Sequence, residues 1–398
     1  MDTRKQKGYQ IAKTKQIVRK PRGWMVPSQS SNKTYFVDEE FVCDCPDSVF
    51  HKATCKHAFA VRYSIKAIVE TTQGAVVKEK RLTYPQAWAI YDKCQQTEKQ
   101  RFMELLQDLL KEVDEPIQIN GRPHISIRDN IFASALKVYS QFSLRRFMTD
   151  LETAREKGFV SSKPCFASVG HFIQRESLTP LLSQLIQITA LPLRSVEDKF
   201  AVDSSGFRTT KFNEYCKEAH DTKQKHEWIK CHIICGVKTN IITAVEVGLE
   251  HHSADSPQFI PLVNATHNAG FIMNEVSGDK AYSSIANYNA VRELGGQAYI
   301  PFRNNTTGMS KGNKARLWRR MFWYFQLKQE DFMKHYHLRS NVESTFFMIK
   351  AKFNDNLKSK SRTAQINELL LKILCHNICV LIQESYELGI EPNFLRDA

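Results

Sequence analysis

KFAVDSSGF, residues 199–207, decides the fold predicted for this chain. Its apolar run Phe200–Val202 is typical of a buried strand, and it ends on a carboxylate, Asp203, that small residues follow. Two more strand-like segments, WIKCHIICGV (228–237) and NIITAVEV (240–247), are separated by KTN, which is typical of a hairpin. Helix and strand patterns then alternate as far as QAYIPF. This order predicts an α/β fold with a mixed sheet flanked by helices.

A second carboxylate follows another strand pattern. Asp279 comes after a short apolar run and a glycine in EVSGDKAYSS, as Asp203 comes after its own apolar run. Taken alone, such an aspartate is more often a helix cap or a turn residue. Because an unpaired carboxylate next to a sheet is costly to bury, Asp203 and Asp279 are also candidates for pairing or for metal binding.

A third carboxylate lies in the basic, aromatic stretch HYHLRSNVESTFFMIKAKF, residues 335–353. Read as one helix, this stretch places Tyr336, Arg339, Glu343 and Lys350 on a single face. Ordinary surface ion pairs would explain Arg339 and Glu343 but leave Tyr336 and Lys350 without a role. Carboxylates from separate segments can instead hold the divalent ions that promote phosphodiester cleavage.

These motifs resemble those of the DDE insertion-sequence transposases. Tyr336-x-x-Arg339-x-x-x-Glu343, with Lys350 seven residues further on, resembles their Tyr-Arg-Glu-Lys signature, and Asp279-x-x-Tyr282 resembles their second aspartate motif. The resemblance covers about residues 120–385. It implies a ribonuclease-H-like domain in which Asp203, Asp279 and Glu343 bind Mg²⁺ or Mn²⁺. It further implies hydrolysis at the terminal inverted repeats and transfer of the freed 3′-OH to target DNA, with DNA contacts from Tyr282, Tyr336, Arg339 and Lys350.

A cysteine cluster stands near the N-terminus. Cys43-x-Cys45 and Cys55-x-His57 supply three thiolates and one imidazole, a ligand set that suits tetrahedral, structural Zn²⁺. His51 is a possible substitute ligand without the paired spacing. The pattern resembles the SWIM zinc finger, which implies a small ββα unit that binds nucleic acid or protein.

Charge points to a polyanionic partner. Lys and Arg number 56 against 42 Asp and Glu, a net charge of +14, although simple solubility is the plainer explanation. A basic run holds five candidate DNA contacts, Lys311, Lys314, Arg316, Arg319 and Arg320. We assign most of the aromatic residues within that run to core packing.

Other features favour a reducing cytosol. Cysteines outside the cluster are scattered, and the basic N-terminus lacks an apolar signal core. The apolar C-terminal stretch is interrupted by Glu368, Lys372, His376 and Asn377, so we expect no membrane span. With the resemblance, this places the protein at the nucleoid in the cytoplasm of a prokaryotic cell.

The expected organisation has five parts: a basic arm (1–33), a SWIM-like finger (34–80), a helical DNA-binding or dimerisation region (81–195), a ribonuclease-H-like catalytic domain (196–385) and a tail (386–398). The expected function is that of an insertion-sequence transposase acting on double-stranded DNA, at transposon ends and target. A homodimer on paired ends is implied by the family alone. Two alternatives stay open: a transposase-derived DNA-binding regulator that does not cleave, and a metal-dependent nuclease without strand transfer.

Overall fold

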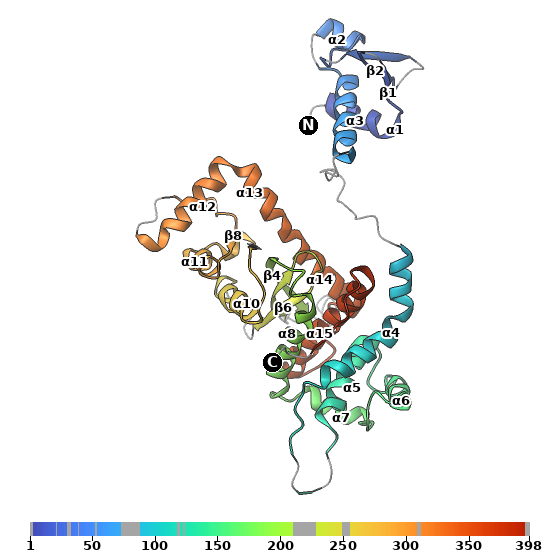
Figure 1. Ribbon diagram of the computed structural model, residues 1–398, viewed down its shortest axis with the longest axis vertical. Helices are drawn as coiled ribbons and strands as arrows, with labels where there is room; N and C mark the ends of the chain where they lie inside the picture. The colour runs from blue at the N-terminus through green and yellow to red at the C-terminus, as the bar shows by residue number, and fades with distance from the viewer. Residues whose placement is uncertain are drawn as a thin grey trace, which may run out of the picture. The chain divides into compact units, whose positions relative to one another are not determined.

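The computed structural model describes residues 3–20, 22–29, 33–38, 40–51, 54–72, 88–117, 120–121, 124–209, 228–248, 255–308 and 312–394. Two compact units make up the chain, Met1–Trp88 and Ala89–Ala398. Each unit has its own cluster of buried apolar side chains, and Figure 1 shows the helices and strands of both.

The N-terminal unit joins a small antiparallel sheet, in the order β1-β2-β3, to three helices. Its elements are α1 (Thr3–Thr14), β1 (Val18–Lys20), β2 (Gly23–Pro27), β3 (Thr34–Asp38), α2 (Pro46–His51) and α3 (Lys56–Thr72). We expected residues 1–33 to form an arm, but α1 packs on α3 and buries Ile11 completely. The folded unit therefore begins well before residue 34, and the end of the expected finger, 73–80, lies outside the described residues.

The second unit is built on a five-stranded mixed sheet in the order β6-β5-β4-β7-β8. Its strands are β4 (Lys199–Arg208), β5 (Trp228–Gly236), β6 (Ile242–Gly248), β7 (Glu275–Gly278) and β8 (Gln297–Tyr299). The first three pair antiparallel, with the expected hairpin between β5 and β6, whereas β7 and β8 add in parallel. The α/β prediction with a mixed sheet is thus confirmed.

Helices surround this sheet. Those that precede it are α4 (Trp88–Leu110), α5 (Ile127–Ser140), α6 (Met148–Glu156), α7 (Phe166–Ile173) and α8 (Leu178–Ala190). Those that follow β6 are α10 (Ser256–Asn268), α11 (Ile285–Glu293), α12 (Arg316–Leu327), α13 (Gln329–Tyr336), α14 (Ser340–Phe353) and α15 (Arg362–Glu387). The region before the sheet is all-α among its described residues, as the sequence predicts.

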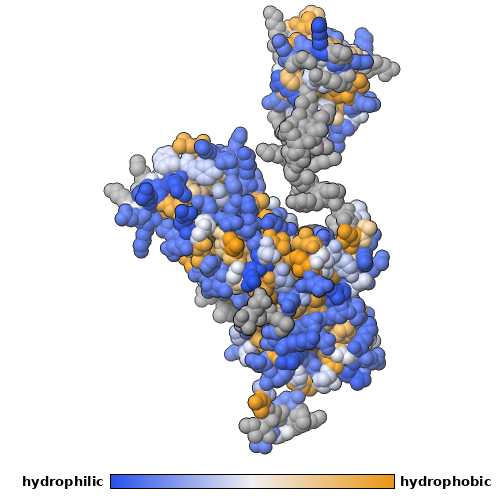
Figure 2. All heavy atoms as spheres, viewed as in Figure 1, coloured by the Kyte–Doolittle hydropathy of each residue, from blue (hydrophilic) through white to orange (hydrophobic). Residues whose placement is uncertain are grey.

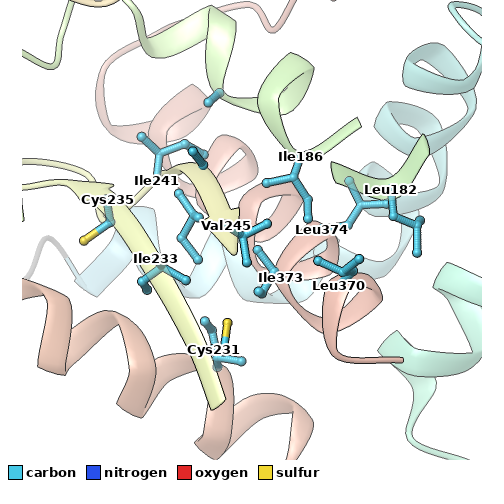
Figure 3. Close-up of a cluster of buried hydrophobic side chains, with 14 of the residues drawn as sticks. Leu182, Ile186, Cys231, Ile233, Cys235, Ile241, Val245, Leu370, Ile373 and Leu374 are labelled. Carbon is cyan, nitrogen blue, oxygen red and sulfur yellow. The ribbon is translucent and has the colours of Figure 1, made fainter. Parts of the chain in front are cut away.

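One continuous core joins the helical region to the sheet. Leu182 and Ile186 of α8 meet Leu374 of α15, and these side chains cover Val245 of β6 (Figure 3). No separate core begins at residue 196 within the described residues, because α8, α15 and the strands share the same buried cluster. The expected boundary between 81–195 and 196–385 is therefore not a boundary between two compact units.

Helix α15 is long and apolar enough to cross a membrane, but its most apolar window is entirely buried inside the unit. The four polar residues in its sequence are buried as well, and each has a hydrogen-bond partner. Asn377, for example, both accepts from the amide of Ile242 (2.9 Å) and donates to its carbonyl oxygen (2.7 Å). These bonds specify how α15 sits against β6.

The segment 335–353 differs from the single helix that we expected. Helix α13 ends at Tyr336, a 3₁₀ turn (η4) spans His337–Arg339, and α14 begins at Ser340. The expected core role of the nearby aromatic residues holds for Trp318 and Phe322, which pack around Phe302, whereas Trp323 is exposed.

Truncation of Leu374 to alanine removes a fully buried side chain where α8, α15 and β6 meet. We expect Leu374→Ala to lower the free energy of unfolding by about 2–5 kcal/mol, measured by urea denaturation. Leu327, 78% exposed on α12, is the matched control, and its truncation should cost under about 0.5 kcal/mol. Equal losses for the two variants would contradict the proposed core.

Candidate active site

Strand pairing sets the two aspartates side by side. In the parallel ladder of β4 and β7, Val202 pairs with Gly278, and each aspartate is the next residue in its chain. Adjacent strands lie about 4.8 Å apart, so Asp203 and Asp279 leave the ladder as neighbours. Strand β4 itself continues to Arg208, so Asp203 marks the end of the pairing with β7 and not, as expected, the end of its strand.

Backbone amides orient both carboxylates. Asp203 accepts from the amide of Ser204 (2.8 Å), and Asp279 accepts from the amide of Lys280 (2.6 Å) at the start of a short 3₁₀ turn, η2 (Lys280–Tyr282). The first of these bonds favours the ionised form of Asp203, but burial outweighs it and raises the pKa of this carboxyl.

Arg339 links the first acid to the third. Its guanidinium donates to Asp203 Oδ2 at 2.6 Å and also pairs with Glu343 Oε1, so one cation holds two carboxylates from distant segments. The charge of Arg339 lowers the pKa of Asp203, and the negative charges of Asp279 and Glu343 raise it. All three acids therefore lie close enough to interact electrostatically.

The three acids offer the kind of oxygen ligands that a hard divalent ion uses. Mg²⁺ prefers oxygen ligands and retains several waters, so a few carboxylates from separate segments suffice to hold it. The repulsion that Asp203 receives from Asp279 and Glu343 is the kind of interaction that a divalent cation relieves. Such an ion competes with Arg339 for Asp203 and Glu343, because the guanidinium already pairs with both.

Lys350 of the predicted signature also meets β4. Lys350 donates to the hydroxyl of Ser205 (2.7 Å) and lies over the ring of Phe207, 5.1 Å from its centroid. Asp203, Ser205 and Phe207 alternate along β4 and so share one face. The 3₁₀ turn and α14 therefore cross this face, with Arg339 at one end and Lys350 at the other.

Tyr282 lies in the interior and not at a surface that DNA could reach. We expected it at the DNA surface, but it is 1% exposed, and its hydroxyl lies 3.3 Å from Nδ1 of the buried His232. Tyr282 packs against Phe259 of α10, which explains why the turn after Asp279 faces the interior. Its position favours a structural role beside Asp279.

Most of the predicted basic contacts lie at the surface. Lys314, Arg316 and Arg320 are exposed around the start of α12, and Arg319 is partly exposed. Figure 2 shows hydrophilic residues (blue) gathered over this helix. Lys311 lies outside the described residues, and contact of the others with DNA stays a prediction.

Three residues near the acids were not assigned to this site from the sequence. Phe347 is 71% exposed on α14, one turn after Glu343 and less than one turn before Lys350. Lys280 and Arg303 line a pocket that also contains Asp279. The helical spacing could have revealed Phe347, whereas only the folded chain brings Arg303 to Asp279.

The four predicted zinc ligands converge in the N-terminal unit. Their donor atoms all lie within 4.8 Å of one another and are buried, on two segments: Cys43 and Cys45 after β3, Cys55 and His57 where α3 begins. His57 Nδ1 is 3.8 Å from the sulfur of Cys43 and 3.9 Å from that of Cys55. Zinc bonds of about 2.3 Å to sulfur and 2.0–2.1 Å to nitrogen give tetrahedral edges of about 3.6 Å, so the cluster fits Zn²⁺.

The chemistry of the thiols suits a metal site. A hydrogen bond from the Cys43 thiol lowers the pKa of Cys55 to about 3, helped by His57 and by the amide of Ala58. A thiolate is the form of cysteine that binds metal. The described cysteines are all free, so disulfides do not compete for the cluster.

Part of the second unit matches a known protein family. Residues 194–378 match the family model of the transposase DDE domain. This range contains all five strands of the mixed sheet and the three acids Asp203, Asp279 and Glu343. The match supports a DDE transposase, and it does not extend to the cysteine cluster.

Among solved structures, the chain is similar to a cryo-EM structure of a piggyBac transposase synaptic complex with hairpin DNA. The TM-score is 0.35 and the sequence identity 10%, over 74% of each chain. No curated protein matches the sequence.

Removal of one zinc ligand tests the metal centre. We expect Cys55→Ser to lose about one equivalent of zinc and to unfold the N-terminal unit, because metal binding and folding are coupled in small units of this kind. Atomic absorption measures the zinc, and limited proteolysis with mass spectrometry locates the unfolding. Cys165→Ser, at an exposed cysteine of the second unit, should change neither. Full zinc occupancy in Cys55→Ser would contradict the assignment.

Proposed function

We propose that this protein is the DNA transposase of an insertion sequence, which binds terminal inverted repeats, cleaves DNA and transfers the freed strand to a target. The observation that carries the proposal is the meeting of three acids from distant segments inside a region that matches the transposase DDE domain. We also propose that the mixed sheet and its helices form a ribonuclease-H-like domain.

In the proposed mechanism, Asp203, Asp279 and Glu343 hold Mg²⁺ or Mn²⁺. The metal supplies activation of the attacking water or 3′-OH and stabilisation of the leaving oxygen. The protein fixes the acids in three ways: through the β4–β7 register, through amide hydrogen bonds to the two aspartates, and through α14 for Glu343. These supports are in place before substrate arrives, and binding of the ion then requires Arg339 to give up its pairing with Asp203 and Glu343.

The cations of the signature bind the DNA backbone in this proposal. Arg339 has a planar fork that suits carboxylate and phosphate alike, so it can exchange one for the other when the acids bind a metal. Lys350 is held beside Asp203 through Ser205, and burial lowers its pKa. Tyr336 supports Arg339, whose guanidinium lies 5.8 Å from the tyrosine ring centroid.

Phe347 fits the same interface. An exposed aromatic ring between Glu343 and Lys350 contributes little to folding, since most of it stays in contact with water, but it is well placed to stack on a DNA base. We assign it this role at the strand end that reacts.

Two further surfaces contact DNA or protein in this proposal. The SWIM-like unit adds a zinc-dependent basic surface for DNA or protein, and α12 adds a second basic surface. Double-stranded DNA from the transposon ends and the target is the substrate, and a homodimer pairs the ends. The site of action is the nucleoid in the cytoplasm of a prokaryotic cell.

Replacement of Glu343 by glutamine tests the catalytic assignment. We expect Glu343→Gln to slow Mg²⁺-dependent cleavage by at least about 100-fold, because a metal ligand is lost, and to change DNA affinity by less than about threefold. The substrate is a duplex that carries the inverted repeat flanking the coding sequence. Cleavage is followed on denaturing gels, and affinity by fluorescence anisotropy.

Glu330→Gln, on the exposed first turn of α13, gives the same charge change away from the acids and should cleave normally. Retained cleavage in Glu343→Gln would overturn the assignment. Donor-target joined products from the wild-type protein separate a transposase from a simple nuclease, and binding without any nicking would favour a regulator.

Removal of the Phe347 ring tests base stacking. We expect Phe347→Ala to weaken binding of a duplex with an unpaired 3′ end by about tenfold, and Phe347→Trp to retain it, because stacking contributes roughly 1–3 kcal/mol per base. Fluorescence quenching of 2-aminopurine placed at the strand end reports the stacking directly. Leu327→Ala, which truncates an equally exposed apolar side chain on α12, is the control. Equal quenching by wild type and Phe347→Ala would refute the role.

A further inference from the structure

A polar pocket of about 450 Å³ lies beside Asp279. Its lining comes from the turn after β7 and the loop after β8: Asp279, Lys280, Ala281, Arg303, Asn304 and Asn305. Strands β7 and β8 are parallel neighbours, with Ser277 paired to Tyr299, so both segments leave the sheet at the same edge. In open α/β sheets, the carboxyl ends of parallel strands are a common place for ligands.

Two cations shape the charge of this pocket. Among the described residues, neither Lys280 nor Arg303 forms a salt bridge with a carboxylate, and Asp279 is the one acid in the lining. Arg303 approaches the carbonyl oxygens of Lys280 (3.5 Å) and Ala281 (3.4 Å), which leaves part of its fork free to donate elsewhere. The excess positive charge and the amide groups of Asn304 and Asn305 favour an anionic ligand.

The loop that carries Arg303 starts from a fixed point. The residue before it, Phe302, is 5% exposed and packs against Trp318 and Phe322, and Tyr288 donates a hydrogen bond to the carbonyl oxygen of Ile300. Arg303 therefore emerges from a packed aromatic cluster next to the turn of Asp279. A loop that is anchored in this way loses less backbone entropy on binding than a free loop does.

We propose that this pocket binds a DNA phosphate next to the one that reacts at Asp279, with Arg303 and Lys280 as its ligands. The inference rests on the proposed function, because it takes Asp279 to lie at the reacting phosphate. A phosphodiester suits the pocket since it carries one negative charge and several acceptor oxygens, which match the guanidinium fork, the ammonium and the two amides. The phosphate belongs either to the transposon end or to the target, which present the same chemistry.

Neutral backbone linkages test this contact. Single methylphosphonates are placed in turn along a duplex bearing the flanking inverted repeat, and in a second arm along a target duplex. We expect one position, in one arm, where the neutral linkage weakens wild-type binding about tenfold, the scale of a charge-assisted hydrogen bond. In Arg303→Gln the same linkage should change affinity less than twofold, because the contact is already lost. Lys280→Gln should show a partial loss at that position, and Arg303→Lys should retain part of the effect.

Arg292→Gln, which removes an exposed cation at the end of α11, is the matched control and should keep the wild-type profile. Melting temperatures check that all variants fold. If wild type cleaves the end duplex but Arg303→Gln keeps the wild-type sensitivity at every position in both arms, the pocket inference fails alone. If wild type neither cleaves nor binds the duplex, the proposed function fails and the pocket inference with it.

Discussion

The parallel pairing of β4 with β7 places the carboxylates of Asp203 and Asp279 next to each other. Other parts of the second unit offset the repulsion between these charges. Like charges at neighbouring strand ends repel, and burial of Asp203 raises the cost. Arg339 offsets part of this cost by pairing with Asp203 and Glu343 together. The electrostatics of the sheet edge thus determine where α14 must lie, since Arg339 and Glu343 stand on either side of the start of that helix.

Hydrogen bonds also hold the C-terminal end of α14. The chain after it pairs with the end of β4, where Arg208 donates to the carbonyl oxygen of Asp355 (2.9 Å) and accepts from Leu357 (2.7 Å). Lys372 of α15 donates to the carbonyl oxygens of Asn354 and Asn356, at 2.9 Å each. Burial lowers the pKa of Lys372 to about 8, so this support has an electrostatic cost. Polar groups in the core helix thereby fix the far end of the helix that carries Glu343.

Patterns within a few residues were enough to predict the strands, the mixed sheet, the zinc ligands and the three acids as candidates, because each depends on local spacing. Contacts between distant segments were not predictable in the same way. The burial of Tyr282 depends on α10, and the pocket at Asp279 depends on a loop that follows β8. The basic composition of residues 1–33 suggested an arm. It gave no indication that the apolar residue Ile11 of α1 is completely buried. In 335–353, a 3₁₀ turn interrupts the expected helix between Tyr336 and Ser340, yet Arg339 and Lys350 both still reach β4.

The N-terminal unit shows why its cysteine cluster also has to be counted as core. Cys43, Cys45 and Cys55 belong to its one described buried cluster, whose remaining members are few: Ile11, Trp24, Val26, Val37, Ala58, Ala60 and Val61. A core of this size is marginal for a unit under 90 residues, and such units commonly need a metal or disulfides. Without a cation, hydrogen bonding to Cys55 and burial raise the pKa of Cys43, so only a bound metal would hold all three thiols as buried thiolates. Zinc bound at this cluster would therefore stabilise the packing of α1 on α3 as well as its own ligands, and any DNA affinity of the basic residues on α1 would then depend on the metal.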